Sequence, residues 1–130
     1  MAEMSNFLED ALINATLRAT TYTSVATVYV SLWTSDPTDA GSGTEVTGGS
    51  YARTAVSFAT ASGTSGNILN DADVTFPTAT ASWGTVGWIG INDAASSGNL
   101  LYHSPLDTSK TIDTGDIFKI STGNLSVTLA

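Results

Sequence analysis

The chain has 130 residues, enough for one modest hydrophobic core, and a net charge of −8 from 12 carboxylates against four basic residues. This charge excludes a groove that binds nucleic acid, because such a groove needs cations along the phosphate backbone. The sequence contains no cysteine, which excludes disulfides and thiolate metal sites.

The N-terminal segment predicts an amphipathic helix from about Asn6 to Arg18. Ser5 is a favourable N-cap, and the early acids Glu9 and Asp10 and the late Arg18 match the helix dipole. The apolar residues that recur at helical spacing are Phe7, Leu8, Ala11, Leu12 and Ala15. We expect them to contact either the rest of the protein or a neighbouring subunit.

The same segment is unlike a targeting or membrane sequence. It has acidic residues where a signal peptide would be positively charged, and its apolar residues are interrupted too often for a membrane span. We therefore expect synthesis in a cytoplasm and no membrane partner.

After the helix, the pattern changes to the alternation of β-strands. In TVYVSLWT (27–34), one predicted face carries Val28, Val30 and Leu32, and the other carries Tyr29, Ser31 and Trp33. The stretch 35–50 contains one proline, four glycines and three carboxylates, so we expect an exposed loop.

Further strands are predicted along the rest of the chain, within 51–58, 68–77, 83–93, 100–106, 114–121 and 124–130. The sequence GTSGN (63–67) predicts a turn, and Pro77 should end a strand in which Val74 and Phe76 share a face. Glycines at 84, 87 and 90 indicate bulges or the close approach of another backbone.

Seven or eight short strands at such regular spacing predict a mainly β protein. We expect an antiparallel β-sandwich, jelly-roll-like, with one N-terminal amphipathic helix. A parallel sheet would need crossover helices, which the sequence does not offer. We expect a single domain, 1–130, with a helical arm at 1–18 and the β-sandwich at 25–130.

Three residues invite a catalytic or metal-binding interpretation. His103 is the single histidine, but a GxSxG nucleophile motif is missing, so we expect a structural histidine. Asp71 and Asp73 share a strand face and would suit a glycosidase pair or a Ca²⁺ site. Turn capping is favoured, because the glycine and distal glutamate of a calcium loop are missing. We therefore expect no catalytic residues, no metal and no cofactor.

The stretch GGSYAR (48–53) raises the question of a ligand-cradling loop. It lacks the Lys-Ser/Thr and the following helix of a phosphate loop, so we expect a turn that delivers Tyr51 and Arg53 onto a strand. Arg53 should pair with a carboxylate or stack on Tyr51 or Trp33, within one subunit or between subunits. The candidates for stacking on a sugar ring are Trp33, Trp83 and Trp88, although a core role is favoured for them.

Several stretches together resemble a family of small virion structural proteins of tailed bacteriophages, commonly labelled tail fibre or head decoration proteins. The resemblance spans almost the whole chain, and its most specific parts are LWTSDPTDAGSGTEVTGGSYAR (32–53) and WGTVGWIGINDA (83–94). It implies a non-enzymatic component of the virion.

A small acidic β module with an amphipathic helix suits docking on a larger particle. The sequence therefore favours a capsid decoration or cement protein. A tail fibre, tail-tip or carbohydrate-binding host-adhesion protein is the alternative. The expected partners are major capsid or tail proteins and further copies of the chain, with contacts through Phe7, Leu8, Ala11, Leu12, Tyr51 and Arg53.

Overall fold

The computed structural model describes residues 2–61 and 66–129, which form one helix and nine strands. The helix is α1 (Asn6–Leu17). The strands are β1 (Glu3–Met4), β2 (Val28–Trp33), β3 (Thr54–Val56), β4 (Asn67–Leu69), β5 (Val74–Thr75), β6 (Gly84–Asn92), β7 (Leu100–Ile112), β8 (Lys119–Ile120) and β9 (Ser126–Thr128).

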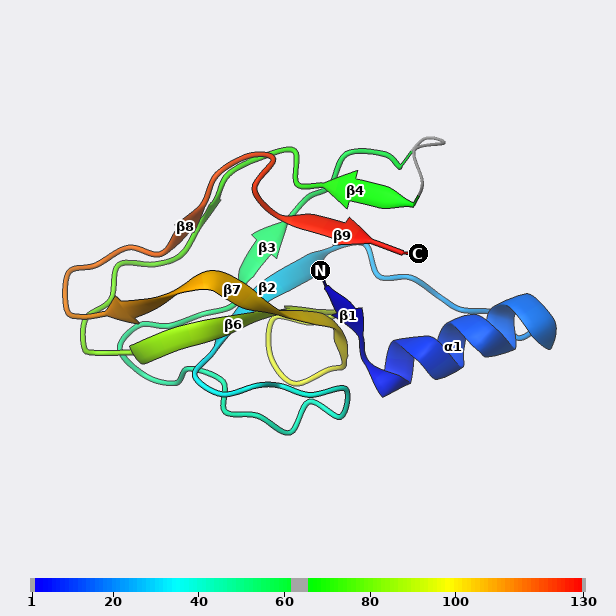
Figure 1. Cartoon of the computed structure of the whole chain (residues 1–130), viewed down its shortest axis with the longest axis horizontal. Coiled ribbons are helices and arrows are strands. Elements are labelled where there is room, and N and C mark those ends of the chain that lie inside the picture. The colour runs from blue at the N-terminus through cyan, green and yellow to red at the C-terminus, as the bar shows by residue number, and fades with distance from the viewer. Residues whose placement is uncertain (1, 62–65, 130) are drawn as a thin grey trace.

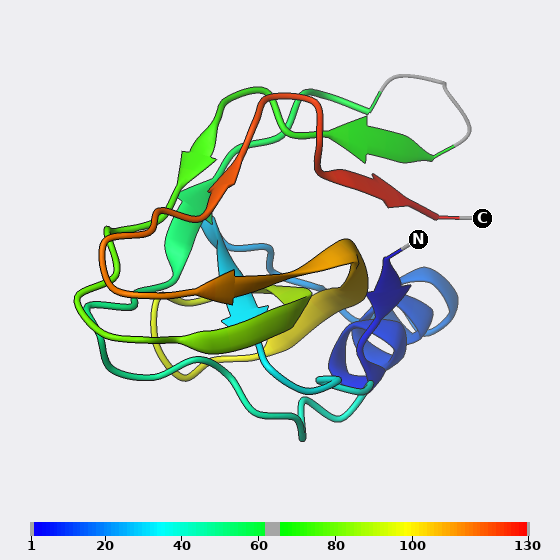
Figure 2. The ribbon, with the colours of Figure 1, turned by 60° about the vertical axis from the view of Figure 1, so that its left-hand side comes forward.

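Five strands form one antiparallel sheet in the order β1-β7-β6-β2-β3, and two ribbons, β4-β9 and β5-β8, lie over one face of it (Figures 1 and 2). This arrangement confirms the predicted mainly β, antiparallel fold with one N-terminal helix. The jelly-roll arrangement is not confirmed, because the second layer consists of two separate two-stranded ribbons.

The hydrophobic core lies between the sheet and the ribbons. The alternation predicted for β2 is confirmed, since Val30 and Leu32 are buried in the core while Ser31 and Trp33 lie on the opposite face. The ribbons and the segments beside them contribute further core side chains. Together, sheet, ribbons and connecting segments supply Val56, Val74, Phe76, Trp83, Val86, Ile89, Ile91, Phe118, Leu125 and Val127 to the core.

Each of the three glycines of β6 lies in a different structural environment. Gly84 has a φ of +80°, and Gly87 lies where the register between β6 and β7 shifts. At Gly90 the close neighbours are side chains, because an added Cβ would lie 2.7 Å from Ser31 Oγ and from Leu100 Cδ1. The close approach predicted at Gly90 is therefore made by side chains on the outer face of the sheet, and not by another backbone.

Helix α1 is capped as the sequence predicts and projects from the β layers (Figure 1). Ser5 accepts a hydrogen bond from the backbone N–H of Leu8, and the helix ends at Leu17, with Arg18 as C-cap. Only Leu8 is buried among the helical residues. Phe7 is exposed, about 100° around the helix from Leu8, so it does not pack against the β layers as Leu8 does, and its contact with a neighbouring subunit stays a prediction.

The stretch 35–50 is less exposed than predicted. Pro37 and Val46 are buried, and the backbone N–H of Val46 donates to the Leu32 carbonyl at 2.9 Å. The loop therefore folds back along the end of β2. Its polar composition is accommodated because most of its other side chains face solvent.

Some strand boundaries differ from the predictions. β7 continues to Ile112, six residues beyond the predicted end, whereas only Thr54–Val56 of the stretch 51–58 is a strand. The turn predicted at 63–67 lies partly outside the described residues. Among the described residues, α1 is too short and too polar to cross a membrane.

Candidate functional site

Arg53 joins two loops at one end of the sheet. Its Nε and Nη2 donate to the two carboxylate oxygens of Glu45, each at 2.8 Å, and the side chain is 11% exposed. Its Nη1 donates to the carbonyls of Ala94 and Ser97 at 3.1 and 2.8 Å. Arg53 therefore pairs with a carboxylate within the chain and fixes the loop between β6 and β7 to the loop after β2.

Tyr51 shares the same carboxylate from the core side. Its hydroxyl donates to Glu45 Oε2 at 2.7 Å and accepts from the backbone N–H of Leu32 at 3.0 Å. Burial raises the pKa of Tyr51 well above its ordinary value, and the Glu45 carboxylate raises it further. The ring stacks on Phe76 and meets Trp83 edge-on, with centroids 6.2 and 5.4 Å away.

The glycine pair before Tyr51 forms a turn that packs against Trp83. Gly48 and Gly49 both have positive φ, +74° and +58°. An added Cβ at Gly49 would lie 2.8 Å from Trp83 Nε1, which donates to the Gly49 carbonyl at 2.9 Å. The indole therefore fills the space beside Gly49.

The three tryptophans differ in their access to solvent. Trp33 and Trp83 are 5% and 4% exposed, so neither ring offers a face to a sugar. Trp33 Nε1 donates to Ser31 Oγ at 2.8 Å on the outer face of the sheet. Trp88 pairs with Trp33 across β2 and β6 and is half-buried, which leaves it the single tryptophan with an accessible surface.

His103 lies at the junction of β7, β1 and the loop 35–50. The ring is 6% exposed, and its Nε2 lies 2.8 Å from Asp39 Oδ1 and 4.0 Å from Glu3 Oε2. Its Nδ1 lies 3.9 Å from Asp36 Oδ1. Sequence reasoning missed this grouping, because Asp39 is separated from His103 by 64 residues along the chain.

The two aspartates considered for catalysis accept hydrogen bonds from different segments. Asp71 accepts from the Ser57 hydroxyl, and Asp73 accepts from the backbone N–H and hydroxyl of Thr122 at 2.8 and 2.9 Å. The Thr122 backbone N–H holds the pKa of Asp73 below its ordinary value. Both carboxylates are used to fasten loops.

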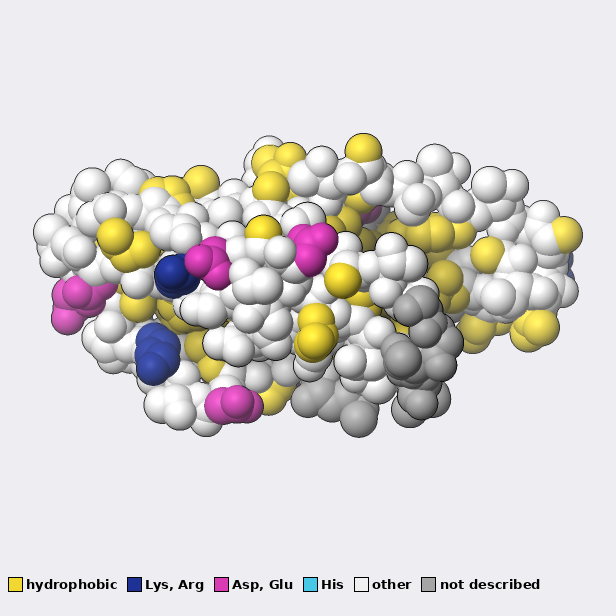
Figure 3. Space-filling model, turned by 90° about the horizontal axis from the view of Figure 1, so that it is seen from above, with side chains coloured by type: hydrophobic (Ala, Val, Ile, Leu, Met, Phe, Trp, Pro, Cys, Tyr) yellow, Lys and Arg dark blue, Asp and Glu magenta, His cyan; other side chains and the backbone are white. Residues whose placement is uncertain are grey.

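Exposed apolar side chains are found along the projecting helix. Ile13 and Leu17, one turn apart, are 56% and 79% exposed, and Figure 3 shows hydrophobic side chains along the end of the molecule formed by α1. We call Ile13 and Leu17 the outer face of α1. It lies opposite the buried Leu8 and the partly buried Leu12 and Ala15.

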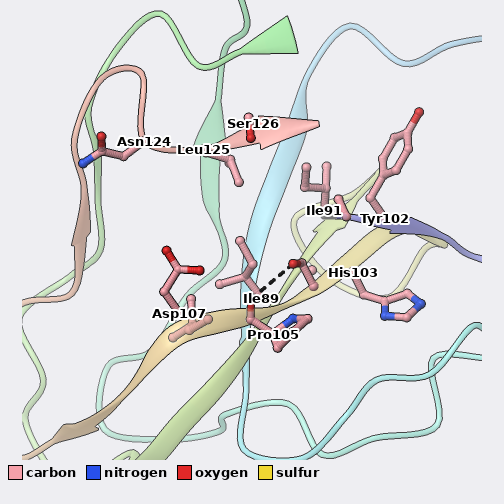
Figure 4. Close-up of a pocket in the computed structure, with 13 residues that line it drawn as sticks. Ile89, Ile91, Tyr102, His103, Pro105, Asp107, Asn124, Leu125 and Ser126 are labelled. Carbon is pink, nitrogen blue, oxygen red and sulfur yellow. Dashed lines mark hydrogen bonds between the residues drawn. The ribbon is translucent and has the colours of Figure 1, made fainter. Parts of the chain in front are cut away.

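A cavity of about 210 Å³ lies between the sheet and β9. Ile89, Ile91 and Leu125 form its apolar part, and Asp107 and Ser126 add polar groups (Figure 4). Its volume is below the roughly 300–1,000 Å³ of ordinary ligand sites. The cavity therefore offers little room for a small-molecule substrate.

Comparison with known families decides the classification of the chain. A family model described as Podophage GP4 fiber I protein gp80 matches residues 3–128. The chain belongs to this family. This membership confirms the resemblance to virion structural proteins of phages. It also supports a structural role in a phage virion. No curated protein matches the chain.

Proposed function

We propose that the chain is a non-enzymatic fibre component of a phage virion. The observation that carries this proposal is the match of residues 3–128 to a family described as a podophage fibre protein. The sequence alone favours a capsid decoration protein, on the basis of acidity and small size. Those properties suit a fibre module equally, and the family description supports the fibre alternative.

The use of the polar side chains supports a non-enzymatic role. His103 contacts Asp39, and Asp71 and Asp73 hold neighbouring loops. A general base or nucleophile has to face a substrate, whereas these groups face the protein's own segments.

The outer face of α1 supports a contact with a neighbouring virion chain, either another virion protein or a further copy. Exposed Ile13 and Leu17 lie on a helix that extends away from the β layers (Figure 1). Burying what remains exposed of these two side chains would stabilise a contact by roughly 2–4 kcal/mol before the costs of association are counted. We therefore propose that α1 attaches the β module to its neighbour.

The experiment is to locate the protein on intact phage particles by electron microscopy with an antibody to the chain. Copies at the tail fibres support the proposal, and copies spread over the head would identify a decoration protein instead. A virion carrying the Ile13→Ser, Leu17→Ser double variant should lose the protein, whereas Glu9→Gln on the same helix should retain it. Retention of the double variant would exclude attachment through α1.

A further inference from the structure

We propose that Glu3, Asp39 and His103 form a binding site for a divalent transition metal such as Zn²⁺. The three side chains come from β1, the loop 35–50 and β7. Each offers one ligand atom, and the three atoms lie within 4.8 Å of one another. One imidazole nitrogen with two carboxylate oxygens is a donor set that Zn²⁺ accepts, with water completing the coordination.

The backbone positions these side chains without help from an ion. Glu3 and His103 are direct partners in the pairing of β1 with β7, so their side chains lie on the same face of the sheet. Figure 4 shows that His103 points away from the side of β7 on which Tyr102 lies. The Asp39 carbonyl accepts from the backbone N–H of Asn6 at 2.9 Å, which fixes the loop beside β1.

The distances suit insertion of an ion. Two ligands about 2.0–2.1 Å from a tetrahedral metal lie about 3.3 Å apart. The Nε2 of His103 lies 2.8 Å from Asp39 Oδ1 and 4.0 Å from Glu3 Oε2, so the observed separations lie on either side of that value. The carboxylate oxygens of Glu3 and Asp39 lie within 4.8 Å of each other, so these exposed side chains would close that gap by up to about 1.5 Å to complete the geometry.

Charge gives the independent reason for a cation. Three carboxylates, those of Glu3, Asp36 and Asp39, lie within 4.0 Å of one imidazole ring that is nearly buried. Within residues 2–61 and 66–129, the basic partner of these carboxylates is His103, while Arg53 and Lys119 pair with Glu45 and Asp73. This grouping of negative charge favours a cation beside the ring.

Metal binding would also use Asp36. A metal on Nε2 requires the ring proton on Nδ1, which lies 3.9 Å from Asp36 Oδ1, so Asp36 would have to approach by about 1 Å to accept that proton in a hydrogen bond. A carboxylate beside the second nitrogen orients a metal-binding histidine and strengthens it as a ligand. The bound ion would tie β1, and with it the start of α1, to the sheet and to the loop 35–50. The site does not depend on where in the virion the chain sits.

The test uses the full chain, free of affinity tag and stripped of metal, titrated with ZnCl₂ and separately with MgCl₂ in a calorimeter. We expect one Zn²⁺ per chain, a higher melting temperature with Zn²⁺ and no such effect of Mg²⁺. Glu3→Gln should weaken Zn²⁺ binding at least about tenfold, the loss typical of even an outer-shell partner. Glu9→Gln, an exposed carboxylate on α1, should bind as the wild type does.

His103 is the only histidine in the chain, so its ring resonances in an NMR spectrum report on this site alone. They should shift on addition of one equivalent of Zn²⁺, and acid should reverse the shift as protons compete for the ligands. Two outcomes would overturn the proposal: ring resonances unmoved by Zn²⁺, or equal Zn²⁺ affinity for Glu3→Gln and wild type.

Discussion

Arg53 connects segments that lie far apart in the chain. Its guanidinium is largely buried and bonds to Glu45, Ala94 and Ser97. Arg53→Ala would leave the Glu45 carboxylate without its charged partner, so we expect a loss of roughly 3 kcal/mol in the free energy of unfolding. Lys119→Ala is the control, because that ion pair is exposed to solvent and should contribute little. Denaturant unfolding measures both, and equal effects would contradict the structural role of Arg53.

Tyr51 makes stability depend on alkaline pH. Its pKa is raised in the folded protein, so the folded state keeps the phenol proton while the unfolded state loses it above about pH 10. The free energy of unfolding should therefore fall as the pH rises above about 10. Tyr51→Phe should reduce that fall, and Tyr102, whose pKa burial also raises, should leave a residual slope. Denaturant midpoints across this range that fall equally in both proteins would refute the assignment.

At the scale of elements, β6 shows how closely the outer face of the sheet is packed. An added Cβ at Gly90 would lie 2.7 Å from Ser31 Oγ and 2.9 Å from Trp33 Nε1, whereas at Gly87 the nearest contact is 3.7 Å. We expect Gly90→Ala to destabilise by about 1–3 kcal/mol through overpacking. Gly87→Ala should be tolerated, within about 0.5 kcal/mol. Thermal and chemical unfolding of the two variants test this, and a stable Gly90→Ala protein would show that Trp33 can move aside.

For the whole molecule, the net charge of −8 opposes association of copies, because like charges repel. If copies associate through the apolar outer face of α1, self-association should strengthen with salt, which shortens the screening length from about 10 Å at 0.1 M to about 3 Å at 1 M. Sedimentation velocity at low and high ionic strength measures this. The Ile13→Ser, Leu17→Ser variant should stay monomeric in both, and association that weakens with salt would indicate an interface of ion pairs.

The sequence by itself determined the features that depend on near neighbours. The alternation in Val28–Trp33 predicts both faces of β2, because successive side chains of a strand point to opposite sides. Ser5 predicts the start of α1, since its side chain caps a backbone N–H three residues later. The number and spacing of such strands predict the mainly β class, and the stretches 32–53 and 83–94 predict the phage family.

Only the tertiary structure decided which distant groups meet. The pairing of Arg53 with Glu45 depends on the path of the loop 35–50, which composition alone predicts to be exposed. Asp39 reaches His103 across 64 residues, because strand order brings β1, β7 and that loop together. Local periodicity carries no information about such meetings, since they arise from how strands pair and loops pack once the core has formed.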